Sequence, residues 1–94
     1  MKFEELKIGK MYINEDDRLL VASAPELFNH KNVDYLDLSE TFIVLGIEKE
    51  FHNFPWIKVL TPKGVVGWIV WSHISNVDLF EKNFIEVTPF VYRG

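Results

Sequence analysis

The sequence predicts a small all-β domain, and three observations support this prediction. Residues 56–60 (WIKVL) and 65–70 (VVGWIV) are β-branched and aromatic runs on either side of the turn sequence TPKG. Proline presets the backbone for such a turn and glycine accepts the positive φ that ends it, so the two runs predict a β-hairpin. Residues 40–48 form another long run of this kind. Short strand-like segments separated by polar or glycine-containing turns account for much of the remaining chain.

The length and composition indicate one domain with an aromatic-rich interior. The chain has 94 residues, of which 48% are hydrophobic and 15% are aromatic. A chain of this size buries only about 60–65% of its unfolded surface on folding, so its small core provides little excess stability. Each aromatic ring can remove a large area from water. We therefore expect rings both in the core and in a contact patch on the surface.

The N-terminal part predicts one helical turn and two strands. Phe3 and Leu6 are spaced as on one face of a helical turn within residues 1–6, which is too short to be stable unless it docks. Residues 11–13 form the first strand-like run, and the polar residues 14–17 are typical of a turn. Residues 18–22 form the next strand-like run, which ends at a small-residue and proline segment.

The middle of the chain predicts two loops and one long strand. Residues 26–36 contain apolar residues without a clear period, which indicates a long loop. The run at residues 40–48 is apolar on both faces, so this strand is either covered on both sides or bent across a barrel corner. Residues 49–55 indicate a loop that exposes Phe51 and Phe54.

Four pieces of the sequence, taken in order and spacing, resemble the bacterial SH3-like domain. They are WIKV at residues 56–59, KG at 63–64, GWI at 67–69 and SHI at 72–74. Residues 19–25 and 39–46 are similar to the first and second strands of that family. The resemblance implies a small five-stranded SH3-like barrel with a long first loop and a 3₁₀ turn near residues 70–74. The barrel core would lie at about residues 10–75 of a single domain spanning 1–94.

Residues 76–94 extend past the usual end of that family. The run FIEV at residues 84–87 predicts an additional short strand, which the Thr-Pro pair after it would end. Residues 90–92 (FVY) form an apolar tail. Such a tail is expected to pack along the barrel or against a second subunit.

The resemblance implies a contact surface built from residues 26–36, 49–55 and 71–73, because loops on a rigid barrel often carry binding. Its candidate partner-binding residues are Trp56, Trp71, His73, Tyr35, Phe51 and Phe54.

The matched groove departs from that of eukaryotic SH3 domains, which carry a tyrosine where this chain has His73 and a proline where it has Val70. This departure argues against polyproline binding, which needs an aromatic-lined groove. We expect Trp68 to pack in the core or at its rim. For Trp56 and Trp71 the sequence leaves packing and partner contact both open.

Several kinds of chemistry lack support in the sequence. His30, His52 and His73 do not have a metal-ligand spacing, and the acidic clusters at residues 15–17 and 34/37 lack the calcium-loop pattern. There is no cysteine, no Gly-x-Ser-x-Gly motif and no glycine-rich phosphate loop. We therefore expect no enzyme activity, no cofactor and no metal. The net charge of −4 argues against nucleic-acid binding.

The sequence predicts a location in the cytoplasm, or in the host cytoplasm if the protein is viral. The N-terminal residues MKFEELKIGK contain no apolar signal core, and no run is long enough to cross a membrane. No membrane partner is therefore expected.

The leading functional expectation is a small binding module that acts by protein–protein interaction. The opening LKIGKMY at residues 6–12 resembles small accessory proteins of tailed phages, which implies a modulator of a host or viral protein. One alternative is a structural or self-assembling protein, either a homodimer formed through the C-terminal tail or a virion component. Another is the cell-wall (peptidoglycan) binding common in the bacterial family, which would require export.

Overall fold

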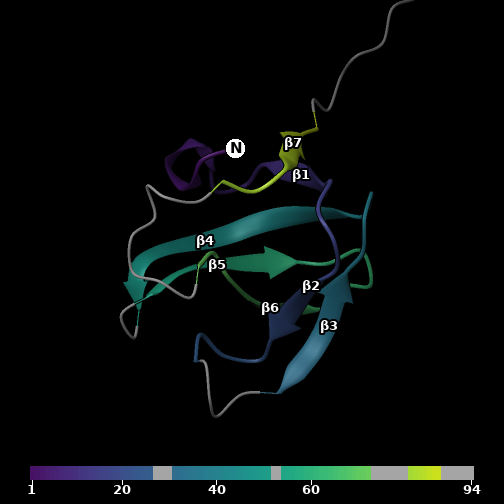
Figure 1. The fold of residues 1–94 in the computed structure, drawn as a ribbon. Helices are drawn as coiled ribbons and strands as arrows, with labels where there is room; N and C mark the ends of the chain where they lie inside the picture. The colour runs from purple at the N-terminus through teal and green to yellow at the C-terminus, as the bar shows by residue number, and fades with distance from the viewer. Residues whose placement is uncertain (27–30, 52–53, 73–80, 88–94) are drawn as a thin grey trace, which may run out of the picture.

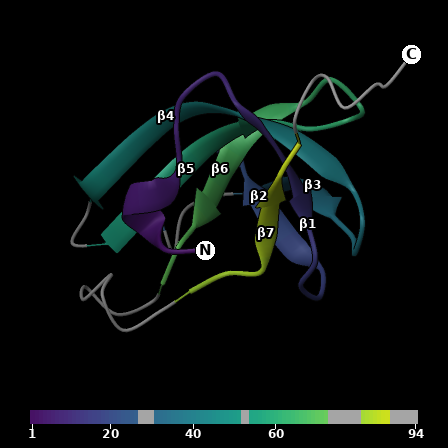
Figure 2. The same ribbon diagram turned by 90° about the horizontal axis from the view of Figure 1, so that it is seen from above.

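The computed structural model describes residues 1–26, 31–51, 54–72 and 81–87, which form a curled antiparallel sheet and one 3₁₀ turn (Figure 1). The 3₁₀ turn, η1, spans Phe3–Glu5. The seven strands are β1 (Met11–Asn14), β2 (Leu19–Ala22), β3 (Asn32–Leu36), β4 (Thr41–Phe51), β5 (Phe54–Leu60), β6 (Val66–Val70) and β7 (Phe84–Glu86). Their order across the sheet is β3-β2-β6-β5-β4-β1-β7. The all-β prediction is confirmed, and the sheet curls into a half-barrel (Figures 1 and 2).

The predicted central hairpin is present as β5 and β6. Its ladder pairs residues 56–60 with residues 66–70 without a register shift. The Thr61 N–H donates to the Val65 carbonyl at 2.9 Å, and the Gly64 N–H donates to the Thr61 carbonyl at 3.0 Å. Gly64 has a φ of +82°, a conformation that glycine adopts without strain. The turn residues therefore close the hairpin as the sequence predicts.

The long strand β4 connects the two halves of the sheet by bending. Its first residues pair with β1, and residues 43–51 run beside β5. The register with β5 shifts between Val44 and Gly46 and again between Glu48 and Phe51. Such bulges bend a strand and increase its twist. Of the two arrangements that the sequence left open for this strand, the structure therefore has the bent one.

The core lies on the inner face of the curled sheet. The Phe84 ring meets the rings of Phe42 and Trp71 edge to face, with centroids 4.9 and 5.7 Å apart, and Phe3 does the same to Trp71 at 5.3 Å. These arrangements suit the charge distribution of aromatic rings. The 3₁₀ turn at Phe3–Glu5 thus docks through its ring, which stabilises a helix too short to form alone. The buried cluster is Phe3, Leu6, Tyr12, Val21, Leu36, Phe42, Val44, Ile57, Val59, Ile69, Trp71 and Phe84.

The additional strand predicted at residues 84–87 is confirmed as β7, and it joins the sheet at β1. β1 therefore lies between β4 and β7. Next to this pairing, Lys2 and Glu81 form an isolated antiparallel bridge, and the Lys82 N–H donates to the Met1 carbonyl at 3.0 Å. The apolar tail at residues 90–92 lies outside the described residues.

The loop predicted for residues 26–36 is wrong over its second half, where β3 (Asn32–Leu36) pairs with β2. The reason is a buried polar residue. Asp34 points inward at a position where a half-buried strand normally carries an apolar side chain, so the alternation with period two is hidden.

Two further boundaries differ from the predictions. The loop expected at residues 49–55 is shorter, because β4 continues to Phe51, which pairs with Phe54 at the start of β5. Pro55 obscured this strand, since proline is rare inside a sheet. The 3₁₀ turn expected near residues 70–74 does not include Val70, which ends β6, and residues 73–74 lie outside the described residues.

Across the described ranges, no helix has both the length and the apolar character needed to cross a lipid bilayer.

Candidate binding site

The hairpin of β2 and β3 shares one backbone ladder pair with the rest of the sheet. Ala22 of β2 pairs with Trp68 of β6, and this is the single ladder pair between the two strands. Next to it, a Cβ atom on Gly67 would lie 2.7 Å from the Ala22 carbonyl oxygen and would also collide with the Val21 side chain. Glycine is therefore required where the two strands meet.

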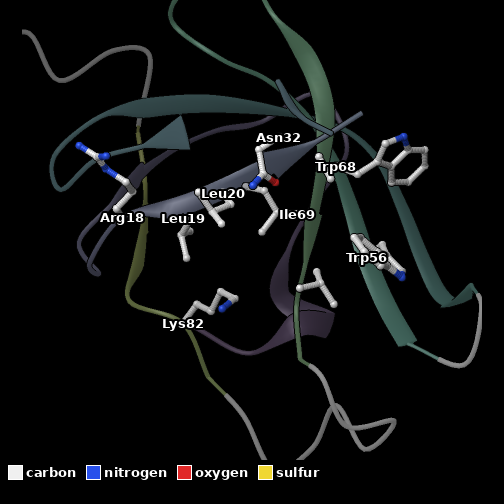
Figure 3. Close-up of a pocket in the computed structure, with 10 residues that line it drawn as sticks. Arg18, Leu19, Leu20, Asn32, Trp56, Trp68, Ile69 and Lys82 are labelled. Atoms are coloured by element: carbon white, nitrogen blue, oxygen red, sulfur yellow. The ribbon is translucent and has the colours of Figure 1, made fainter. Parts of the chain in front are cut away.

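Beyond this pair, β2 and β6 separate and leave a groove of about 310 Å³ between them (Figure 3). In a continued antiparallel register Leu20 would face Val70, but the described residues have no such pair. We call this opening the β2/β6 groove. It is lined by Arg18, Leu19, Leu20, Ala22, Asn32, Trp56, Trp68, Ile69, Val70 and Lys82.

Two indole rings form one side of the β2/β6 groove (Figure 3). Trp56 is 2% exposed, and its Nε1 donates to the Phe51 carbonyl at 3.1 Å. Trp68 is half-buried, and the Phe51 ring stacks on it with centroids 6.5 Å apart and an interplanar angle of 28°. Trp56 is thus held by a hydrogen bond, and Trp68 is the indole with more surface available to a ligand.

Two cations lie at the other side of the groove (Figure 3). The Arg18 guanidinium donates to Asp37 through Nε at 2.7 Å and lies over the Tyr35 ring at 4.0 Å. The Lys82 ammonium lies 5.6 Å from the centre of the Trp71 ring. Burial lowers the pKa of Lys82, and the charge of Asp16 acts in the opposite direction.

Charged side chains also tie the β2–β3 hairpin to the turn between β5 and β6. Lys63 Nζ lies 3.4 Å from the buried Asp34 Oδ1 and 4.6 Å from the Tyr35 ring centre. Burial alone would raise the pKa of Asp34. The Thr61 hydroxyl, the Tyr35 backbone N–H and the Lys63 charge outweigh it and hold this pKa below its ordinary value. Among the described residues, no hydrogen bond of good geometry reaches the buried Asp34 Oδ2.

The structure brings together only part of the residue set that the sequence singled out. Trp56 lines the β2/β6 groove and Phe51 stacks at its margin, where it covers Trp68. Phe54 is half-buried at the start of β5.

The remaining members of that set lie elsewhere. Tyr35 lies on β3 of the hairpin, where its ring contacts the cations of Arg18 and Lys63. Trp71 is 2% exposed and belongs to the core, so the alternative in which its ring faces a partner does not hold. His73 lies outside the described residues.

Sequence reasoning missed Lys82 and undervalued Trp68. The alternation along residues 66–70 offered a signal for Trp68: Gly67 and Ile69 are buried, so Trp68 between them points to the other face. No comparable signal exists for Lys82. It reaches the groove only because β7 joins the sheet beside β1.

The acidic clusters serve structural roles in the described residues. Both oxygens of Asp16 accept hydrogen bonds from Asn83, at 2.9 and 2.8 Å. Asp37 binds Arg18, as described above. Within the described part of the chain, no three His, Cys, Asp or Glu side chains gather in a way that could hold a metal ion. All three histidines lie outside that part.

Comparisons of the chain with models of known protein families, with curated proteins and with solved structures find no match in any of the three.

Proposed function

We propose that this chain is a small, non-enzymatic binding module that recognises a segment of another protein. The observation that supports this proposal most is the β2/β6 groove, which combines an indole wall, aliphatic side chains and two cations in one opening. A few polar groups in a mainly apolar cleft are typical of ligand sites. Tryptophan and arginine are also enriched among the residues that dominate protein interfaces.

The strand order supports an SH3-like architecture for this module. Five strands follow one another as β7-β1-β4-β5-β6, and the β2–β3 hairpin is inserted between β1 and β4 along the chain. This order agrees with a five-stranded SH3-like barrel in which the long first loop is folded into a hairpin. The resemblance of residues 6–12 to accessory proteins of tailed phages supports a partner from a bacterial host or a virion.

Selection from a random-peptide display library tests the proposal. We expect enriched peptides to bind the wild type and to lose at least about tenfold in affinity for Trp68→Ala, as is typical of a central tryptophan. Val66→Ser is the matched control, because Val66 lies on the same strand, is 49% exposed and does not line the groove. The proposal fails if no peptide is enriched, or if enriched peptides bind Trp68→Ala as tightly as the wild type.

Self-assembly is the second candidate, and a row of apolar side chains on the outer face of the sheet favours it. Cross-strand neighbours project to the same face, and here they form one row across β1, β4, β5 and β6, extended by Val87 just past the end of β7. Two shallow cavities lie along it, both lined by Met11 and Ile43. The row consists of Val87, Met11, Ile43, Leu60 and Val66.

Sedimentation separates the two candidates. A dimer that dissociates in Met11→Glu supports assembly through the row, whereas one that dissociates on deletion of residues 89–94 supports assembly through the tail. A monomer argues against both forms of self-assembly.

A further inference from the structure

We propose that the β2/β6 groove binds an extended segment of another protein in which a glutamate or aspartate stands beside an aliphatic or aromatic residue. The carboxylate is paired with Lys82, and the apolar neighbour rests on the Trp68 indole. This inference rests on the proposed function and names its ligand class.

The charge at the groove is opposite to that of the whole chain. The chain carries a net charge of −4, yet both charged side chains that line the groove, Arg18 and Lys82, are cations. A cleft with walls of low dielectric concentrates the field of such groups. The groove therefore attracts an anionic segment despite the acidic surroundings.

Lys82 is the cation that is available to a ligand. Arg18 is already paired with Asp37. Among the described residues, no carboxylate forms an ion pair with the Lys82 ammonium, and both oxygens of Asp16 accept hydrogen bonds from Asn83. The lowered pKa of Lys82 agrees with this position, because burial disfavours the charged form and outweighs the attraction of Asp16. An incoming carboxylate would remove that penalty.

The same groove offers an apolar surface across from Lys82 (Figure 3). Trp68 is half-buried and Ile69 and Val70 follow it on β6, while Leu19 and Leu20 add apolar lining from β2. A free carboxylate or phosphate would leave this wall in water. A peptide that carries an acidic and an apolar side chain next to each other fits both sides.

The backbone around the groove favours an extended ligand. β2 and β6 run antiparallel but share the single pair at Ala22 and Trp68, so their facing edges diverge past it. Unpaired strand edges are common sites for the addition of an extended peptide. In such a peptide, neighbouring side chains point to opposite sides, which suits a groove with a cation on one side and an indole on the other.

Two matched peptide arrays test this inference. The first carries hexapeptides with a central glutamate followed by each aliphatic or aromatic residue, and the second has glutamine in place of the glutamate. All peptides are acetylated and amidated, so the glutamate is the only charge. We expect glutamate peptides to bind at least about tenfold more tightly than their glutamine partners, as for a hydrogen bond to a charged group.

Three variants locate the effect. In Lys82→Met the preference for glutamate should fall below about twofold, because the charge is removed while the methylene chain is kept. Lys82→Arg should retain the preference. Lys58→Met is the matched control: the Lys58 ammonium also lies near an indole, 5.8 Å from the Trp68 ring centre, but Lys58 does not line the groove. It should leave the preference unchanged, and thermal melts check that every variant is folded.

The outcomes separate the two proposals. If glutamate and glutamine peptides bind equally well and both cause amide NMR shifts at the groove, this inference is overturned. The proposed function as a binding module is then still supported. A preference for glutamate over glutamine peptides that is as large in Lys82→Met as in the wild type also overturns this inference. Tighter binding of a single-stranded oligonucleotide than of any peptide at the groove would overturn both, as would the absence of binding from both arrays and from the random library.

Discussion

The β4–β5–β6 meander and the β2–β3 hairpin belong to one sheet, but different forces hold them in it. In the meander, backbone ladders join most of each strand to its neighbour, and Ile57 and Val59 contribute to the core from one face. The hairpin meets the meander at one backbone pair. Its remaining attachment comes from the close approach at Gly67 and from the Asp34–Lys63 ion pair.

A buried asparagine completes the attachment of the hairpin at its base. The Asn14 side chain is fully buried at the end of β1, and its Nδ2 donates to the Leu36 and Asp37 carbonyls, each at 3.2 Å. Backbone ladders hold the meander by regular pairing, whereas the hairpin depends on a few individual side chains. The candidate site lies at the boundary between these regions, where a strand edge is left without a ladder partner.

The largest effect is expected from a core deletion in the meander. Ile57→Ala should lower the free energy of unfolding by about 2–5 kcal/mol, because Ile57 is fully buried in the central strand and a cavity replaces it. Urea unfolding measures the loss. Hydrogen exchange should show that amides of both regions lose protection together, since the meander carries the common core. Loss of protection in the hairpin alone would contradict the comparison.

A smaller and more local effect is expected at the boundary. Gly67→Ala should cost about 1–3 kcal/mol through overpacking against β2, and hydrogen exchange should speed up in β2 and β3 more than in β4 and β5. Gly46→Ala is the matched control, because its Cβ would be 3.4 Å from the Lys58 Cβ and meets no backbone. Equal effects of the two substitutions would show that the close approach does not hold the hairpin.

The smallest effect is expected from the ion pair, and it depends on pH. The folded-state pKa of Asp34 lies below the ordinary value of 3.8, so its stabilising contribution is present above that value and is lost as the pH falls through the folded-state pKa. At neutral pH, Asp34→Asn should cost about 1–2 kcal/mol in urea unfolding, and the difference from the wild type should shrink in acid. Asp17→Asn, on an exposed turn, is the control. An acid profile that Asp34→Asn leaves unchanged would contradict this account.

The contrast between the two regions also explains which elements the sequence could predict. The β5–β6 hairpin is encoded locally, by β-branched and aromatic runs around a proline and a glycine. β3 was missed because Asp34 occupies an inward position, and its burial is compensated by Lys63 from a distant turn. A single sequence records local alternation, but it does not record which distant cation will neutralise an inward carboxylate.

The candidate site was predicted less completely than the fold, for the same reason. Trp56 was identified because it stands at a strand start, and Trp68 could have been recognised from the alternation along β6. Lys82 reaches the groove through the pairing of β7 with β1, which joins segments far apart in the chain. For Trp71 the sequence left packing and partner contact both open, and its packing depends on Phe3 and Phe84, whose rings reach it from distant parts of the chain.

The position of β1 between β4 and β7 has a consequence for the timing of folding. β1 leaves the ribosome before every other described strand, but its second neighbour is the last of them to be made. Until residues 84–86 emerge from the exit tunnel, one edge of β1 stays open and could pair with a strand of another nascent chain. The sheet is therefore completed only after β7 has emerged, and a ribosome stalled before residue 84 would display an incomplete and association-prone intermediate.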